Sequence, residues 1–150
     1  MTEHLIALQN ALRSESTLEA LGLAARHTII ARTLKGISVD GTAFRQYSPG
    51  YSKKRARHDL PVSPVNLMWD DSEKGMLNSI THTVFQDLSG LELFIGDAQK
   101  ALIASYHNDL GAGRSKVIRH FWALSEDELN ALSKITDEQI EKVLQMQNLK

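Results

Sequence analysis

The sequence contains no cysteine, and this absence excludes several kinds of site. A disulfide scaffold, a thiolate nucleophile and a cysteine-ligated zinc or iron–sulfur centre all require that residue. No stretch reaches the roughly 18 consecutive apolar residues expected of a transmembrane helix. The opening residues, MTEH, carry no basic segment followed by an apolar one, so we expect no signal peptide. These absences predict a soluble intracellular protein without a membrane partner, and they suit a reducing cytoplasm.

The chain also lacks a strong net charge. Its 17 Lys and Arg residues face 18 Asp and Glu residues, which gives a net charge of −1. A dedicated DNA-binding domain is typically far more basic. The two signs are nonetheless separated: residues 26–58 hold eight basic residues and one acid, while residues 59–110 hold eight acids and two basic residues. Such segments can pair within one chain or between neighbouring copies.

The remaining composition is that of a globular protein. Hydrophobic residues make up 42% of the chain and charged residues 23%. A length of 150 residues fits one domain, spanning residues 1–150, and is long enough to bury a real core. We therefore expect a single domain without internal repeats.

A long helix is expected from Thr17 to Lys35. Ser16 and Glu19 have the spacing of a capping box, in which each side chain satisfies a backbone N–H at the start of a helix. Gly36 follows the last turn, where a left-handed glycine commonly ends a helix. The signals at both ends therefore agree on one helix of about five turns.

This expected helix carries two apolar stripes, whereas a surface helix of a lone monomer needs one. The stripes contain Leu18, Leu21, Ala25 and Ile29, and on the other side Leu23, Ile30 and Leu34. We expect the first stripe to pack on the domain's own sheet. The second is covered either by an N-terminal helix built on Leu5, Leu8 and Leu12 or by another subunit.

Residues 37–74 read as irregular. They are punctuated by Gly41, Pro49, Gly50, Pro61 and Pro64. Loops of this length are usually functional or disordered. We expect residues 46–74 to form an extended arm or mobile loop, with a short strand from Val62 to Trp69.

Strand signals follow the arm. Residues 80–85 and 91–95 alternate with period two, which predicts a β-hairpin, and we place its turn at Ser89-Gly90. A short helical turn at Met76 and Leu77 leads into the hairpin. A third strand is expected over residues 116–122.

Helix signals occupy the rest of the C-terminal half. Asp97 is expected to cap a helix that ends near Asn108. Two further capping boxes predict two C-terminal helices, one opened by Ser125 with Glu128 and one by Thr136 with Gln139.

No catalytic, cofactor-binding or metal-binding residue is predicted. The six histidines include no His-Glu-x-x-His spacing, which would place two imidazoles on one helix face. His107 and Asp109 are two residues apart and would not face each other on a helix. The acids of residues 70–73 lack the spacing of a calcium-binding loop. Neither a Gly-x-Ser-x-Gly elbow nor a Walker A loop occurs.

A basic run lies within the expected arm. It consists of Lys53, Lys54, Arg55 and Arg57. These cations could neutralise phosphates, and Tyr47 and Tyr51 beside them could stack on bases. Alternatively, the run keeps a loop soluble or docks on an acidic neighbour. We favour the second interpretation, because the run is short for a nucleic-acid patch.

Five segments, in order along the chain, together resemble a known family. They are residues 34–48 (LKGISVDGTAFRQYS), 51–54 (YSKK), 66–67 with 75–80 (NL and GMLNSI), 106–107 with Gly111, and 119–125 (RHFWALS). This pattern is similar to that of the phage virion morphogenesis proteins, a family of neck and tail-completion components of long-tailed phages that includes the G protein of phage Mu. The chain departs from the family at His120 and Ala123, where Pro and Gly are usual, and in its more acidic residues 68–74.

The resemblance implies an α+β fold with a long N-terminal helix packed on a small, mostly antiparallel sheet, a long arm and C-terminal helices. It implies a structural virion protein without enzymatic activity or a cofactor. The residues that carry the family's motif are Gly36, Asp40, Gly41, Phe44, Ser48, Arg119 and Phe121. We expect Phe44 and Phe121 to be buried anchors.

The same resemblance implies partners and a location. The protein would form a ring with itself, of six copies rather than twelve, and would touch the tail terminator or tail tube and the head-side connector. It would reside at the virion neck, and in the host bacterial cytoplasm during assembly, with non-specific contact to channel DNA. The interaction residues we hypothesise are Arg45, Tyr47, Tyr51, Lys53, Lys54, Arg55, Arg57, Leu23, Ile30 and Leu34. The alternative function is a small nucleic-acid-binding domain that uses the basic arm.

Overall fold

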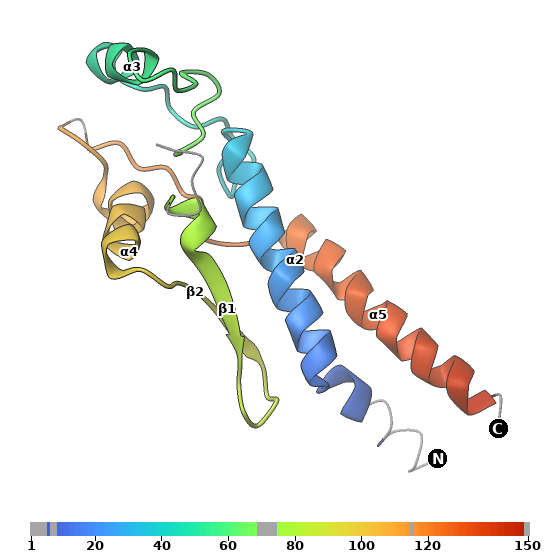
Figure 1. The fold of residues 1–150 in the computed structure, drawn as a ribbon. Helices are drawn as coiled ribbons and strands as arrows, with labels where there is room; N and C mark the ends of the chain where they lie inside the picture. Colours follow the sequence, from blue (N-terminus) through green and yellow to red (C-terminus); the bar gives the residue numbers. More distant parts are fainter. Residues whose placement is uncertain (1–5, 7–8, 69–74, 115, 149–150) are drawn as a thin grey trace. The chain divides into compact units, whose positions relative to one another are not determined.

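The computed structural model describes residues 6, 9–68, 75–114 and 116–148, and it has the expected α+β class (Figure 1). Its elements in chain order are α2 (Glu15–Leu34), α3 (Pro49–Ala56), the 3₁₀ turn η1 (Leu77–Ser79), β1 (Ile80–Val84), β2 (Leu91–Ile95), α4 (Ala98–Ser105), the π-helical turn η2 (Tyr106–Leu110) and α5 (Glu126–Asn148). The strands β1 and β2 form a two-stranded antiparallel sheet.

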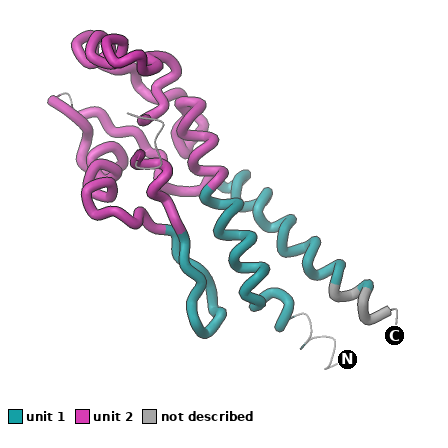
Figure 2. Tube along the Cα trace, viewed as in Figure 1, with its two compact units in different colours: residues 1–26, 82–93, 126–150 teal, residues 27–81, 94–125 magenta. Residues whose placement is uncertain are grey.

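The chain forms two compact units (Figure 2). Unit 1 contains residues 1–26, 82–93 and 126–150, and unit 2 contains residues 27–81 and 94–125. Unit 1 thus holds the first part of α2, the tip of the hairpin and α5. Unit 2 holds α3, α4 and the irregular segments between them.

Helix α2 confirms the expected long helix, but its N-terminal cap differs from the prediction. The Thr17 N–H donates to Oγ of Ser14 at 3.3 Å, so Ser14 caps the helix and the predicted box of Ser16 and Glu19 is wrong. The C-terminal signal is confirmed, because Gly36 has a φ of +73°. A Cβ at residue 36 would also lie 2.9 Å from the Val65 carbonyl oxygen.

Only the first apolar stripe of α2 is well buried. Leu18, Ala25 and Ile29 are buried. On the second stripe, Leu23 is 45% exposed, and Ile30 and Leu34 are half-buried. Leu23 is therefore not well covered within the described chain, and its cover by another subunit stays a prediction. Leu5 and Leu8, on which the covering helix was built, lie outside the described residues.

The expected arm of residues 46–74 contains regular structure and buried residues. Residues 49–56 form α3, where Ser48 is the N-cap and Pro49 occupies the first turn. Val65 and Leu67 are buried. The extended arm is therefore wrong for α3, and residues 62–68 form no strand. The remainder, residues 69–74, lies outside the described part of the chain.

The hairpin is confirmed, and its turn lies earlier than predicted. The Leu88 N–H donates to the Phe85 carbonyl at 2.9 Å, and Leu88 has a φ of +55°. The Asp87 carboxylate accepts hydrogen bonds from both the N–H and the hydroxyl of Ser89. The Phe85 N–H donates to the Gly90 carbonyl at 3.0 Å and closes the loop. The chain thus reverses over residues 86–89, where Asp87 stabilises the turn locally, rather than at Ser89-Gly90 alone.

Helix α4 begins where the sequence predicted and ends differently. Asp97 Oδ1 accepts a hydrogen bond from the Lys100 N–H at 2.9 Å. The helix then continues as the π turn η2 to Leu110. The predicted strand over residues 116–122 does not form; a single antiparallel bridge pairs Ala112 with Val117.

The C-terminus is one helix instead of the predicted two. Helix α5 runs without interruption from Glu126 to Asn148 and includes Thr136 in its interior. The capping-box spacing at Thr136 therefore does not mark a helix start here.

The core of unit 2 brings two distant segments together. The Val39 N–H and the Ser38 hydroxyl both donate to the His120 carbonyl, at 2.9 and 3.0 Å. Phe44 is 4% exposed and Phe121 is fully buried, so the predicted burial of both anchors is confirmed. Residues 38–44 and 119–123 therefore form one packed structure across about 80 residues of sequence.

Arg32 adds a third chain segment to this core. Its Nη2 donates to the carbonyl oxygens of Phe121 at 2.6 Å and Ala123 at 2.8 Å. Because Arg32 comes from α2, these bonds fix the segment after residue 119 against the helix.

Candidate functional site

The most distinctive arrangement in unit 2 is a tyrosine ring that contacts two guanidinium groups. The Cζ atom of Arg55 lies 4.8 Å from the centre of the Tyr47 ring, and that of Arg119 lies 5.3 Å from it. The Tyr51 ring meets Tyr47 edge-on, with 5.1 Å between ring centres. Cations over an aromatic face are attracted by its quadrupole, so this cluster is cohesive.

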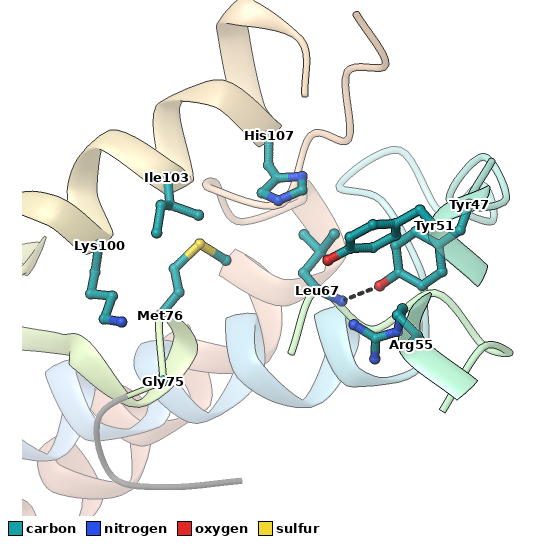
Figure 3. Close-up of a pocket in the computed structure, with 9 residues that line it drawn as sticks. All are labelled: Tyr47, Tyr51, Arg55, Leu67, Gly75, Met76, Lys100, Ile103 and His107. Carbon is teal, nitrogen blue, oxygen red and sulfur yellow. Dashed lines mark hydrogen bonds between the residues drawn. The ribbon is translucent and has the colours of Figure 1, made fainter. Parts of the chain in front are cut away.

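Tyr47 itself is nearly buried, at 9% exposure. Its hydroxyl oxygen accepts a hydrogen bond from the Leu67 N–H at 3.3 Å (Figure 3). Burial raises the pKa of Tyr47, so the ring carries no charge near neutral pH. Both guanidinium groups therefore lie against a neutral ring.

Arg55 is an internal clamp. It is 1% exposed. Its Nε donates to the Pro61 carbonyl at 2.7 Å, Nη1 to the Met68 carbonyl at 2.5 Å, and Nη2 to Oδ1 of Asn66 at 3.2 Å. The hypothesis that Arg55 contacts an outside partner is therefore wrong for this structure, because its donors already bind the chain.

Arg119, the second arginine beside Tyr47, also binds the main chain. Its Nε and Nη2 donate to the Arg45 carbonyl oxygen at 3.1 and 2.9 Å. Burial lowers the pKa of Arg119. An arginine remains protonated even so, because its ordinary pKa is far above neutrality.

Two pockets open beside this cluster, and they share Tyr47, Tyr51 and His107. The first, of about 280 Å³, is also lined by Arg55, Leu67, Gly75, Met76, Lys100 and Ile103. Figure 3 shows the α4 side chains on one side of it and the tyrosines with Arg55 on the other. The second, of about 450 Å³, is lined in addition by Gln46, Ser48, Ala112, Gly113, Arg114, Val117 and Arg119.

The charged side chains that line these pockets are all cationic. Arg55 and Lys100 line the first pocket, and Arg114 and Arg119 line the second. Among the described residues, no Asp or Glu lines either one. The pockets are therefore suited to binding an anionic group against aromatic and apolar walls.

His107 completes the shared wall. Its Nδ1 is buried and has no hydrogen-bond partner among the described residues. Burial, with a smaller contribution from Arg119, lowers the pKa of His107 to about 4. The imidazole is thus neutral at pH 7 and adds no positive charge.

The other predicted interaction residues are mostly at the surface. Arg45, Lys53, Lys54 and Arg57 are exposed, and Tyr51 is 38% exposed. On α3, therefore, three of the four residues of the basic run face solvent and the fourth, Arg55, does not. The structure brings Tyr47, Tyr51, Arg55 and Arg119 together and leaves Leu23 in unit 1.

The motif residues Asp40 and Gly41 form a tight turn. Gly41 has a φ of +81°, and its N–H donates to the Ser38 carbonyl at 3.0 Å. The Asp40 carboxylate accepts hydrogen bonds from the Thr42 hydroxyl at 2.6 Å and the Thr42 N–H at 3.0 Å. These bonds lower the pKa of Asp40, which stays ionised as a turn-forming side chain.

Sequence reasoning missed several residues that line the pockets, chiefly Lys100, His107 and Arg114. The sequence singles out His107 only beside Asp109 and in the family segment of residues 106–107, and neither pattern indicates a pocket. No local pattern distinguishes these residues from ordinary surface ones, because their placement depends on how distant segments pack. Within the described ranges, no group of three His, Asp or Glu side chains is arranged to hold a metal ion.

No helix in the described part of the chain combines the length and apolar character needed to cross a bilayer. Comparison of the chain with protein-family models, with curated proteins and with solved structures gives no match.

Proposed function

We propose that this protein is a structural component of a tailed-phage virion, a ring subunit of the neck or tail end that supports head–tail joining. One observation supports the proposal most directly. The two most specific segments of the resemblance, residues 34–48 and 119–125, are bonded to each other through Ser38, Val39 and Arg119. Two segments that bond to each other are expected to occur together in related proteins, and both segments belong to the family pattern.

The proposed protein acts by assembly, without catalysis or a cofactor. Its partners are further copies of itself, six in preference to twelve, the tail terminator or tail tube, and the head-side connector. It functions in the virion, after assembly in the host bacterial cytoplasm. A six-copy ring matches the symmetry of the tail.

The exposed face of α3 is the surface we assign to neighbours in the neck. Lys53, Lys54 and Arg57 are exposed there beside Tyr51. These cations would contact acidic protein surfaces or the phosphates of channel DNA. The same surface supports the alternative function of a small nucleic-acid-binding domain, although the loss of Arg55 to internal bonds leaves it one cation fewer.

Deletion of the gene, followed by electron microscopy of the induced particles, tests the proposed function. Filled heads with separate or abnormally ended tails are expected, and the intact gene supplied in trans should restore infectivity. Normal infectious virions from the deletion strain would overturn the proposal and bring forward the nucleic-acid alternative.

A charge-reversal variant tests the α3 surface in the same system. Lys53→Glu, Lys54→Glu and Arg57→Glu together should reduce infectivity while the protein still folds. Reversal of Lys134 and Lys142, two exposed cations of α5, is the matched control and should leave infectivity unchanged. Equal effects of the two variants would remove α3 from the interface.

DNA binding is measured separately by a salt-dependent shift assay. Weak binding without sequence preference fits passive contact in a channel. Tight and sequence-specific binding would favour the alternative function instead.

A further inference from the structure

The larger pocket of unit 2 presents two guanidinium groups without a carboxylate partner among the described residues. Arg119 donates through Nε and Nη2 to the Arg45 carbonyl oxygen, and its Nη1 makes no hydrogen bond with the described chain. Arg114 lies on the same pocket and is exposed. Guanidinium forks match the geometry of carboxylates, with which they form charge-assisted pairs. The pocket therefore has donors oriented for an anion.

Much of the rest of the pocket wall is apolar or aromatic, with Gln46 and Ser48 as polar side chains, and this favours an anion that carries an apolar group. Val117 and Ala112 line it together with the two tyrosines. A volume of about 450 Å³ holds one or two side chains. A DNA duplex is far too wide to enter it, and a phosphate would make no apolar contact with the wall. A carboxylate next to an aliphatic side chain would pair with the arginines and also pack against the apolar residues.

The chain itself carries such a pair of side chains at the start of α5. Glu126, Asp127 and Glu128 form the acidic first turn of this helix. Leu129 follows Glu126 at i+3, so the two share one helix face, and Leu129 is 53% exposed. An acid and a leucine are thus presented together on one surface.

Several other carboxylates already have partners inside the chain. Glu19 pairs with His82, and Asp97 caps α4. Asp40 and Asp87 hold their own turns through hydrogen bonds to Thr42 and Ser89. Glu126, by contrast, is exposed and shares one helix face with the exposed Leu129, so the first turn of α5 is an acidic feature able to serve a partner.

We propose that the pocket lined by Arg114 and Arg119 receives Glu126 and Leu129 from a second copy of this chain. The proposal rests on the proposed ring, because a ring is built by a contact between two different patches of the same protein. The pocket is one patch and the acidic turn of α5 is the other. Repetition of this contact around a closed circle joins each copy to the next.

The absence of natural cysteine allows a direct test by disulfide trapping in the full-length protein. Gln46→Cys places a thiol on the pocket rim and leaves both arginines intact. Asn130→Cys places the second thiol one turn after Glu126, on the same helix face. Mild oxidation should give a ladder of dimers and larger species on a non-reducing gel, because a disulfide needs Cα atoms within about 7 Å.

Four comparisons make the trapping specific. The pair Lys35→Cys with Asn130→Cys, which lacks a thiol on the pocket, should give no ladder. In the trapping background, Arg114→Glu should reduce the ladder about tenfold. Lys35→Glu, a reversal of an exposed cation away from the pocket, should leave it unchanged. Arg114→Glu combined with Glu126→Arg should restore cross-linking. The melting temperature of each variant confirms that it folds.

Several outcomes would overturn the proposal. They are a fast-migrating monomer with an internal disulfide, the absence of any ladder, and a ladder that Arg114→Glu leaves unchanged. A larger loss of duplex DNA binding in Arg114→Glu than in Lys35→Glu would assign the pocket to phosphate instead.

The result is independent of the gene deletion described above. A deletion that separates heads from tails, together with no ladder, would overturn the pocket contact and leave the proposed function in place. A ladder together with normal virions from the deletion strain would overturn the proposed function and leave the pocket contact in place.

Discussion

Nε2 of His82 lies 2.7 Å from the carboxylate of Glu19, and the imidazole ring passes directly against Gly22. Glu19 and Gly22 are on α2, and His82 is on β1, all within unit 1. A Cβ atom at residue 22 would lie 2.3 Å from Cδ2 of His82. The glycine therefore makes room for the ring that reaches Glu19.

Gly22→Ala should destabilise the protein, by about 1–2 kcal/mol, because the ring must move and its contact with Glu19 is lost. In an ordinary helix interior the same change is stabilising by about 1 kcal/mol. In a His82→Ala background, Gly22→Ala should therefore become stabilising. Denaturant unfolding of the four proteins in this cycle measures the reversal. The same sign in both backgrounds would show that the ring does not require the glycine.

Arg32→Met should cost about 2–4 kcal/mol of folding stability. The side chain is 9% exposed, and its removal leaves the carbonyl oxygens of Phe121 and Ala123 without their donor. Arg26→Met on the same helix is the matched control. Nε of each arginine has no hydrogen-bond partner among the described residues, so the two variants differ in the Nη2 bonds of Arg32. Thermal and urea unfolding compare the two, and similar losses would contradict the role assigned to Arg32.

Phe121→Ala should lower the free energy of unfolding by about 3–5 kcal/mol, because this side chain is fully buried. Phe85→Ala, at a position that is 42% exposed, should cost far less. Calorimetric melting of both variants provides the measurement. An unchanged melting temperature for Phe121→Ala would remove the residue from the core.

Stability should fall between pH 6.5 and pH 4 because of His107. Its pKa is lowered from 6.5 to about 4, so over this interval the unfolded chain binds a proton that the folded chain does not. The unfolded state then gains relative stability as the pH falls, by up to about 3 kcal/mol in total. Above pH 6.5 the imidazole is neutral in both states and contributes no slope.

A His107→Gln variant should lose this part of the pH dependence. His27→Gln, at an exposed position of α2, should retain it. Urea midpoints measured at half-unit pH steps give the slope for each protein. Parallel curves for wild type and His107→Gln would show that the slope has another source.

Local signals explain which elements were predictable. Gly36 and Asp97 mark helix ends through their own backbone conformation and side chain, and both predictions are confirmed. Helix α3 also has a local signal, since Ser48 before Pro49 is typical of a helix start. The sequence does not predict α3 with certainty, because Pro49 and Gly50 are equally typical of an irregular arm.

Other features could not follow from local preference. Leu88 takes a left-handed conformation that leucine disfavours, so the turn was placed at the neighbouring glycine instead. The capping-box spacing at Thr136 occurs inside a continuous helix, because the spacing alone does not require a chain to start there. In each case the surrounding structure decides.

The candidate site was predictable in part. The sequence singles out Tyr47, Tyr51 and Arg55, together with the motif residue Arg119, and the structure brings these four side chains together. The sequence does not indicate that both arginines are buried, because each binds carbonyl acceptors that the path of the chain supplies. The acceptor of Arg119 is 74 residues away in sequence, and no spacing pattern indicates it.

The acceptors of Arg55 and Arg119 are largely main-chain oxygens, and this has an evolutionary consequence. A carbonyl oxygen is present whatever the side chain at that position, so residue 45, whose own side chain is exposed, is free to drift while it still holds Arg119. Among diverged homologues we expect the two arginines to persist while residue 45 varies. A search for positions that change together among homologues would therefore not detect the contact between Arg119 and residue 45.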